Sequence, residues 1–547
     1  MKHILLLVLI ITGAQNVYSQ IAENTYRLYL TDKNNNEYTL ENPEGFLSDR
    51  ALQRRAKYSI PITENDLPVS KIYIDSLQNL GLKILNSSKW FNTVAIYSTD
   101  KELIDTIDKL DFIKSKTKVK KGLRKNNTHA QTNNYYLEIS ESLQENIDYG
   151  DATVQVGMLN AHVLHQNNFQ GEGMVIAVLD AGFYNVDVLP AFDSLWLNQQ
   201  ILGTKDFVDG GTQVFDASDH GMKVLSVMGG NLPGKLVGTA PKAKYWLLRS
   251  EQTAWEYSVE EDNWVSAAEF ADSVGADIIN SSLGYSEFDD IQQNYTYADM
   301  DGNTAFITRA ADMAASKGIL VVSSAGNLGD DPWNYISAPA DGDSVLTVGA
   351  VDSYANYVSF SSKGPTYDGR VKPDICAMGY RVAVQGIDGN IILSNGTSFS
   401  SPLIAGAAAC LWQALPELTN AQLIQKIRES AHQYSKPDYL LGYGIPDFAK
   451  ASGLYSTNTI TMTPGENSIK IYPNPFESFI YIEFEKKLRQ DIKIEIFDIT
   501  GKKVFSEIFL ATQNEVKIES LQHLNKGLYL VRSYYNRLYT STTLCKQ

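Results

Sequence analysis

Three residue types that together can cleave an acyl bond occur along this 547-residue chain in settings that suit catalysis. Asp180 follows the apolar run 175–179, and a carboxylate at the carboxyl end of a parallel strand stands where active sites of α/β proteins form. His220 lies between Asp219 and Gly221 and begins a helical stretch, and the glycine beside the imidazole is expected to leave room for a substrate. Taken alone, each has a structural alternative: aspartate often caps a helix, and a histidine at a helix start is often structural.

The third residue is Ser398, which lies in the segment 395–402 before a helical stretch of small residues, 403–412. The start of a helix presents free backbone N–H groups and the positive end of the helix dipole. We expect Pro402 in the first turn of this helix, where its missing N–H has no partner to lose. A plain Ser/Thr capping cluster is the structural alternative.

A fourth candidate, Asn327, comes shortly after the apolar run 319–322 and directly after a glycine. Its side-chain amide could donate a hydrogen bond to a developing oxyanion, although an asparagine in this setting is otherwise a turn residue. The combination is harder to explain structurally than any single residue. The order aspartate, histidine, serine along one region is the order found in subtilisin.

The elements that must position these residues lie between about 146 and 454, where short apolar runs alternate with helical stretches. Near-continuous apolar runs suit parallel strands that are covered on both faces. With helices between them, the pattern predicts a doubly wound, mainly parallel α/β domain. The predicted strands are 175–179, 245–248, 277–280, 319–322 and 345–348.

Residues 171 to 450 resemble the subtilisin-type serine proteases, the subtilases of peptidase family S8. Five segments carry the resemblance in order: 178–182, 219–221, 280–284, 325–327 and 396–402. The resemblance implies a serine endopeptidase that hydrolyses peptide bonds in proteins through an acyl-enzyme. It assigns Asp180, His220 and Ser398 to a catalytic triad and Asn327 to an oxyanion hole.

The resemblance also implies a channel in which an extended peptide substrate pairs with the enzyme backbone. The residues expected to line it are Ser282, Leu283, Gly284, Ser324, Ala325 and Gly326. Three positions depart from the family pattern without removing a catalytic group: Ala181 replaces Ser or Thr, Met222 replaces Thr, and Ser400 replaces Ala. A catalytically inactive subtilisin fold used for adhesion is the alternative, and the intact triad weighs against it.

Composition excludes several partners and cofactors. The formal net charge of −16 argues against nucleic acid, which needs a basic surface. Three cysteines without a Cys-x-x-Cys spacing predict neither a disulfide framework nor a structural zinc site, and Cys410 reads as a small core residue. No cofactor is expected. Structural calcium is possible in the family, but the acidic segment 299–303 fails as an EF-hand loop and no metal site is assigned.

The amino-terminal quarter of the chain is predicted to be an export signal followed by a removable domain. Residues 1–19 combine Lys2 with the apolar run 4–11, which is too short to span a bilayer, so a signal peptide is favoured over a membrane anchor. No later transmembrane segment is expected. Residues 20–113 predict a small α+β domain resembling a subtilase propeptide, a transient inhibitor of its own enzyme. The basic and polar residues 114–145 predict a linker that is either merely solvated or a processing region.

The carboxyl-terminal part predicts a linker, 455–467, and a small all-β sandwich, 468–547, built from alternating strands. Segments 471–476, 496–504 and 524–529 resemble the C-terminal sorting domain of the type IX secretion system. The resemblance implies a secreted enzyme, extracellular or attached to the outer-membrane surface, with that machinery as a partner. A carbohydrate-binding sandwich is the alternative.

Overall fold

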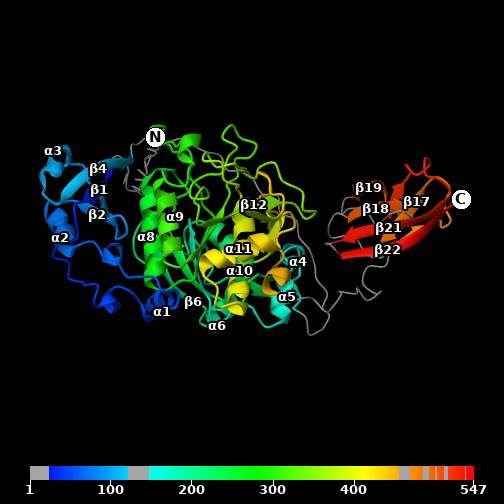
Figure 1. The fold of residues 1–547 in the computed structure, drawn as a ribbon, viewed down its shortest axis with the longest axis horizontal. Coiled ribbons are helices and arrows are strands. Elements are labelled where there is room, and N and C mark those ends of the chain that lie inside the picture. The colour runs from blue at the N-terminus through cyan, green and yellow to red at the C-terminus, as the bar shows by residue number, and fades with distance from the viewer. Residues whose placement is uncertain are drawn as a thin grey trace, which may run out of the picture.

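The computed structural model describes residues 24–120, 147–454, 469–484, 492–498, 502–509, 515–535 and 538–547. The signal-peptide segment, the predicted linker 455–467 and most of the linker 114–145 lie outside these residues. The described chain forms a small amino-terminal α+β domain, a large α/β domain and a carboxyl-terminal all-β domain (Figure 1).

The amino-terminal domain is an antiparallel four-stranded sheet in the order β2-β3-β1-β4, formed by β1 (Thr25–Leu30), β2 (Lys83–Ser88), β3 (Thr93–Tyr97) and β4 (Ile113–Lys120). Helices α2 (Lys71–Asn79) and α3 (Lys101–Thr106) accompany the sheet. Between β1 and α2 the chain carries α1 (Asp49–Lys57) and two single turns, η1 (Pro43–Gly45) and η2 (Glu64–Asp66).

The predicted start of the linker at Lys114 is wrong, because β4 continues to Lys120 and pairs with β1. Lys114 and Lys118 are exposed along this strand, while Ile113 and Val119 are buried. Lysines are common on the outermost strand of a sheet, where they prevent pairing with other chains. The basic composition that suggested a linker therefore belongs in part to an edge strand.

The large domain is built on a seven-stranded, wholly parallel sheet in the order β13-β12-β11-β10-β5-β9-β6. Its strands are β5 (Val175–Asp180), β6 (Ile201–Asp206), β9 (Lys244–Arg249), β10 (Ile278–Ser281), β11 (Leu320–Ser324), β12 (Val345–Val351) and β13 (Ile375–Met378). The five predicted strands form the consecutive middle of the sheet. The two edge strands, β6 and β13, were not predicted; β6 is mostly half-buried and carries no continuous apolar run.

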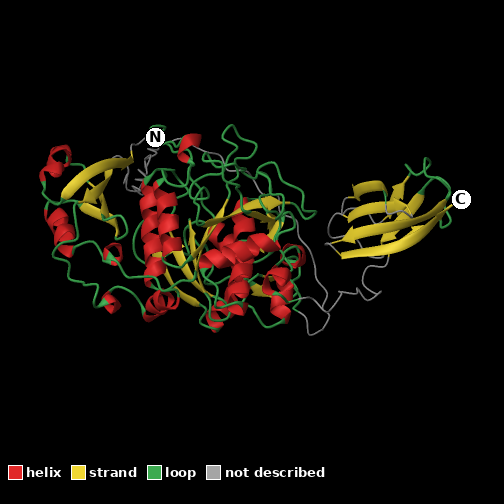
Figure 2. Cartoon of the chain, in the orientation of Figure 1, coloured by secondary structure: helices red, strands yellow, loops and turns green. Residues whose placement is uncertain are grey.

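Helices cover both faces of this sheet, which confirms the predicted doubly wound arrangement (Figure 2). Helices α8 (Val259–Ser273) and α9 (Phe306–Ser316) enclose one apolar core against it. On the other face a larger core includes α7 (His220–Gly229), α10 (Thr397–Ala414) and α11 (Asn420–Ser430). The smaller helices are α4 (Thr153–Gly157), α5 (Ala161–Gln166), α6 (Asp193–Leu197) and α12 (Phe448–Ser452), with the hairpins β7–β8 (Asn231–Leu232, Leu236–Val237) and β14–β15 (Val382–Gln385, Ile391–Ser394).

The carboxyl-terminal domain contains two antiparallel sheets, β16-β17-β20 and β19-β18-β21-β22. Their strands are β16 (Ile469–Tyr472), β17 (Ile480–Phe484), β18 (Ile492–Asp498), β19 (Lys503–Phe509), β20 (Glu515–Ile518), β21 (Gly527–Tyr535) and β22 (Leu538–Lys546). One apolar core takes side chains from both sheets, such as Ile482 and Ile494. The all-β prediction is confirmed.

Two further expectations concern the whole chain. Within the residues that the structure describes, no helix combines the length and the apolar character needed to cross a membrane. All three cysteines are free, and Cys376 and Cys410 are buried. Cys410 therefore is the small core residue that the sequence indicated.

Candidate active site

The predicted aspartate and histidine meet at the carboxyl edge of the central sheet. Asp180 is the last residue of β5 and is fully buried, and His220 is the first residue of α7. The Nδ1 atom of His220 lies 2.8 Å from Oδ1 of Asp180. The N–H of Ala181 also donates to this oxygen at 2.7 Å. The carboxylate thus fixes the orientation of the imidazole, whose side chain remains 32% exposed.

Gly221 allows this approach for a reason that differs from the predicted one. The sequence suggested that a glycine beside the imidazole leaves room for a substrate. A Cβ atom at this position would instead lie 2.8 Å from the Cβ of Asp180 and 2.5 Å from the carbonyl oxygen of Gly182. The missing side chain makes room for the aspartate itself.

The second carboxylate oxygen of Asp180, Oδ2, is buried and has no hydrogen-bond partner among the described residues. The next residue is Ala181, at the position where the family usually has a serine or threonine. The missing hydroxyl and the unpartnered oxygen therefore occur together. Because an unsatisfied buried polar atom is destabilising, this site carries a local energetic cost.

Several charges act on His220. Burial lowers the pKa of its imidazole, but the charge of Asp180, the hydrogen bond to it and the charge of Glu251 outweigh burial and raise the pKa above its ordinary value. Glu251 lies two residues beyond the end of β9 and accepts a 3.3 Å hydrogen bond from Tyr285 Oη. Burial and the charge of Asp180 raise the pKa of Glu251 to about 7. Glu251 was not among the predicted site residues, although it follows a predicted strand that neighbours β5.

Ser398 lies in the first turn of α10, after Gly396, whose φ of 144° suits glycine. The Ser398 residue is 7% exposed, and its Oγ donates to the carbonyl oxygen of Ser282 at 3.3 Å. Helix α10 packs against α7, and the His220 ring lies 6.1 Å from the ring of Phe399, centroid to centroid. The helix start that carries Ser398 thus lies beside the imidazole, while the hydroxyl itself is bonded to Ser282. In enzymes without substrate, catalytic hydrogen bonds are often long or poorly aligned.

Pro402 occupies the second turn of α10, not the first turn as predicted, because the helix begins at Thr397. Its missing N–H would otherwise bond the carbonyl oxygen of Ser398, four residues earlier. That oxygen instead accepts a 2.9 Å hydrogen bond from Ser282 Oγ. Ser282 therefore holds Ser398 through both its hydroxyl and its carbonyl group.

Asn327 lies next to the start of α10. Its Oδ1 accepts hydrogen bonds from the N–H and the hydroxyl of Thr397, at 2.8 and 2.9 Å. Because the oxygen is held in this way, the Nδ2 amide remains able to donate. The backbone N–H of Ser398, in the first helical turn, likewise has no acceptor within the helix. Two hydrogen-bond donors are therefore available beside the hydroxyl, and the sequence did not indicate the anchoring role of Thr397.

The segments expected to bind substrate differ in what their backbones can offer. In the first, Leu283 and Gly284 make no backbone hydrogen bond within the described part of the chain, and Gly284 is exposed. In the second, the N–H of Ala325 donates to Val348 and its carbonyl accepts from Ser337. Leu283 and Gly284 therefore have free backbone groups for pairing, whereas both backbone groups of Ala325 are already used and this residue can only form part of a wall.

Ser324 and Gly326 complete the second segment. Ser324 is buried in β11, and the carbonyl of Gly326 accepts a hydrogen bond from the N–H of Ser362. A Cβ atom on Gly326 would lie 2.8 Å from Ser362 Oγ and 3.0 Å from Ser337 Oγ, and its φ is 106°. Glycine is thus required at this position, because any side chain would clash with the two neighbouring hydroxyl groups.

The carboxylates of the acidic segment 299–303 accept hydrogen bonds from backbone N–H groups of the same loop. Oδ1 of Asp301 accepts from the N–H groups of Asn303 and Thr304, and Oδ2 of Asp299 accepts from the N–H of Thr296. Within the described ranges, no three His, Cys, Asp or Glu side chains are grouped as metal ligands. These observations give no residues to which a metal could be assigned.

Comparison with known proteins identifies all three domains. Residues 171–444, half of the chain, match the model of the subtilase family, peptidase S8. Residues 25–134 match the peptidase S8 propeptide domain of Bacteroidota, and residues 470–546 match a secretion-system C-terminal sorting domain. The last match indicates export through the type IX system to the cell surface or the medium.

Individual relatives agree with these matches. Subtilisin DY of Bacillus licheniformis is 30% identical over 281 residues, which cover 50% of this chain and 90% of the relative. Subtilisin E of Bacillus subtilis is 29% identical over 313 residues, covering 56% and 71%. The epidermin leader peptide processing serine protease of Staphylococcus aureus shares the fold with a TM-score of 0.53 at 17% identity, covering 79% of this chain and all of that one. The chain therefore belongs to the subtilase family of serine endopeptidases.

Proposed function

We propose that this subtilase hydrolyses peptide bonds through an acyl-enzyme on Ser398. His220 takes the proton of the Ser398 hydroxyl as the oxygen attacks the scissile carbonyl, and later returns it to the leaving amine. Asp180 holds the imidazole in the required tautomer and stabilises the imidazolium ion. The 2.8 Å contact between His220 and Asp180 is the observation that carries this proposal.

The oxyanion of the tetrahedral intermediate would be bound by the Asn327 amide and the N–H of Ser398. Thr397 supports this role because it occupies Oδ1 of Asn327 and leaves the amide as a donor. A fixed donor costs no reorganisation when charge develops during the reaction. An extended substrate would pair with the free backbone of Leu283 and Gly284. No cofactor enters this mechanism.

The test is hydrolysis of an unstructured protein, such as a denatured casein, by the purified secreted enzyme. The chain should cleave it, and Ser398→Ala should abolish cleavage. Ser400→Ala is the matched control, because Ser400 lies in the same helix and, among the residues that the structure describes, its hydroxyl bonds only the carbonyl of Thr397. Equal activity of the wild-type and Ser398→Ala chains would overturn the proposal. No activity in either chain would favour an adhesive role for an inactive fold.

We also propose where the segments on either side of the catalytic domain end and what happens to them during secretion. Residues 1–19 would direct export, and cleavage between β4 and α4 would separate the propeptide-like domain from the catalytic domain. Residues 468–547 would be read by the type IX machinery, in keeping with their match to a sorting domain. Deletion of this domain should retain the enzyme in the periplasm. Normal secretion of the truncated chain would instead favour a binding module.

A further inference from the structure

The carbonyl group of Ser398 is held by the central sheet and not by its own helix. The N–H that would donate to it, four residues further on, is missing because residue 402 is a proline. Ser282, directly after β10, donates from Oγ to this carbonyl at 2.9 Å instead. A hydroxyl group has one proton to donate. The neighbours of Ser282 therefore decide whether the Ser398 carbonyl has a partner.

Asn280, in β10, sets the direction of the Ser282 hydroxyl. Its Nδ2 donates to Ser282 Oγ at 3.2 Å. Because an amide nitrogen can only donate, Ser282 Oγ accepts in this bond and its own proton is left for Ser398. Asn280 is fully buried and Ser282 is 5% exposed, so both are shielded from water. A rotation of the Asn280 amide would reverse this arrangement, since its oxygen can only accept.

Ser401, in α10, keeps that amide from rotating. Its Oγ donates to Oδ1 of Asn280 at 3.0 Å, and the residue is fully buried. A serine inside a helix often donates instead to the carbonyl four residues earlier. Here that carbonyl belongs to Thr397 and already accepts the hydroxyl of Ser400 at 3.0 Å. The proton of Ser401 is thus directed to Asn280, which leaves the Nδ2 group of Asn280 facing Ser282.

These groups form a ring of hydrogen bonds that closes through α10, here called the serine ring: Ser401, Asn280, Ser282 and Ser398. Donation runs in one direction, from Ser401 through the sheet and back to the helix at Ser398. The opposite direction would turn the Ser282 proton toward Asn280 and leave the Ser398 carbonyl unpaired. An unpaired buried carbonyl is costly. The ring therefore pins the first turn of α10 to the end of β10.

The elements around Asn280 bring few charged groups toward the serine ring. Asn280 lies between valines of the neighbouring strands β5 and β11, and neither β10 nor β11 contains a charged residue. Helix α10, which packs on these strands, contains none either. Strand β5 contributes Asp180, which is bound to His220 of α7. The other charged residue of α7, Lys223, pairs with Asp219. A titration introduced into the ring would therefore stand out against that of the triad.

We propose that Asn280 and Ser401 are positioning residues for the Ser398 nucleophile and act through Ser282. They keep the proton of Ser282 on the Ser398 carbonyl, which fixes the turn that carries the nucleophile. Both are fully buried, so neither can touch a substrate. This proposal rests on the proposed function and deepens it. A displacement of about 1 Å can cost a hundredfold in rate, so loss of the ring should lower kcat and leave KM nearly unchanged.

Asn280→Asp is the sharpest test, because it changes which atoms can donate without changing the size of the side chain. An ionised carboxyl only accepts, so it would draw the Ser282 proton away from Ser398, whereas a protonated carboxyl can donate to Ser282 as the amide does. Burial raises the pKa of a carboxyl group. The variant should therefore be most active at low pH, relative to wild type, and should lose activity as the introduced carboxyl ionises.

The measurement is steady-state hydrolysis of a fluorogenic peptide, taken from a cleavage site mapped in denatured casein, over about pH 5–9, where buried carboxyl groups titrate. The ratio of kcat in Asn280→Asp to kcat in wild type should fall at least tenfold as the pH rises. A ratio that stays constant or rises with pH would overturn the proposal. Absence of hydrolysis by the wild-type enzyme would refute the proposed function, and this inference with it.

A second set of variants decides the question if Asn280→Asp does not fold. Ser401→Ala should lower kcat about ten- to a hundredfold with little change in KM. Combined with Ser282→Ala it should be no worse than Ser282→Ala alone, because Ser401 acts through Ser282. Ser400→Ala, in the same turn of α10 but outside the ring, should keep the wild-type kcat. An unchanged kcat in Ser401→Ala, or losses that multiply in the double variant, would contradict the proposed positioning.

Discussion

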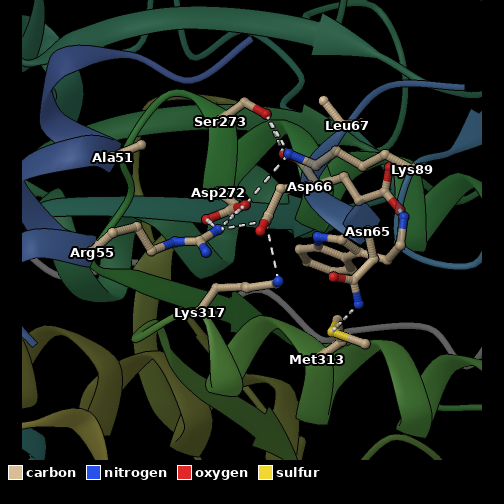
Figure 3. A network of polar contacts seen from close by, with 12 residues as sticks. Ala51, Arg55, Asn65, Asp66, Leu67, Lys89, Asp272, Ser273, Met313 and Lys317 are labelled. Atoms are coloured by element: carbon tan, nitrogen blue, oxygen red, sulfur yellow. Dashed lines mark hydrogen bonds and ion pairs between the residues drawn. The ribbon is translucent and has the colours of Figure 1, made fainter. Parts of the chain in front are cut away.

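The two edges of the central sheet differ in which of their buried polar groups are paired. At the amino edge, buried charges from both domains are paired with one another, as Arg55 is with Asp66 and Asp272 (Figure 3). At the carboxyl edge, some of the groups proposed for chemistry have hydrogen-bonding atoms that are not paired within the described residues. Among the described residues, Oδ2 of Asp180 has no hydrogen-bond partner, and the N–H of Ser398 has no acceptor in its helix. The amino edge joins the two domains through paired charges, although Nε and Nη1 of Arg55 have no hydrogen-bond partner among the described residues. The carboxyl edge leaves the N–H of Ser398 free to donate to a substrate.

Deletion of the triad should have the largest effect at the carboxyl edge. Ser398→Ala or His220→Ala should each lower kcat about a millionfold and Asp180→Ala roughly ten-thousandfold, by analogy with subtilisin. The double variant of Ser398 and His220 should be no worse than either single variant, because the residues act as a unit. Steady-state hydrolysis of a peptide measures this. Independent, multiplying losses would contradict a shared proton transfer between the two residues.

The next effect concerns the oxyanion donor. Asn327→Ala should lower kcat roughly 10²–10³-fold with little change in KM, because the amide would bind charge that exists only in the transition state. Kinetics with a small ester or peptide substrate measure the change. Asn303→Ala, an exposed asparagine of the segment 299–303, is the control. An unchanged kcat would remove Asn327 from the oxyanion hole.

A smaller effect is expected in the pH profile. His220 must be neutral to act as a base, so kcat/KM should rise as the pH increases through the pKa of His220. Burial lowers this pKa, but Asp180 and Glu251 raise it further than burial lowers it. Glu251→Gln removes one of the two anions, so the acid limb should move to lower pH. The exposed Glu287→Gln serves as control; a shift to higher pH in Glu251→Gln would contradict the account.

The smallest effect tests the unpartnered oxygen. Ala181→Ser would add a hydroxyl beside Oδ2 of Asp180 and should raise the free energy of unfolding by about 1 kcal/mol. Thermal or denaturant unfolding of the Ser398→Ala background measures it. Ala181→Cys, of similar size but a weaker donor, should gain less. If Ala181→Ser lost stability, and lost as much as Ala181→Cys, the added hydroxyl would not be satisfying Oδ2 of Asp180.

The sequence predicted the carboxyl edge far better than the amino edge. Strands such as β5 and β11 are covered on both faces, so their apolar runs are continuous and the polar residues that follow them are conspicuous. The triad candidates could be identified because Asp180 ends a buried strand, while His220 and Ser398 lie at the starts of helices. Edge strand β6 carries no comparable run, and the lysines of β4 suggested a linker.

The remaining features depend on contacts between distant parts of the chain. Arg54 and Asp272 are more than two hundred residues apart, and nothing near either residue indicates a buried pair. The clash that a side chain at Gly221 would make with Asp180 likewise appears only when the strand and the helix are placed together. Sequence patterns report burial and local geometry, whereas these pairings are set by tertiary packing.

The proposed mechanism requires that His220 activates the hydroxyl of Ser398 as a nucleophile. Fluorophosphonate labelling of the secreted enzyme, followed by peptide mapping of the adduct by mass spectrometry, tests this requirement. We expect a single adduct on Ser398, lost in His220→Ala and retained in Ser400→Ala. An adduct on a different serine, or none in an enzyme that hydrolyses protein, would contradict it.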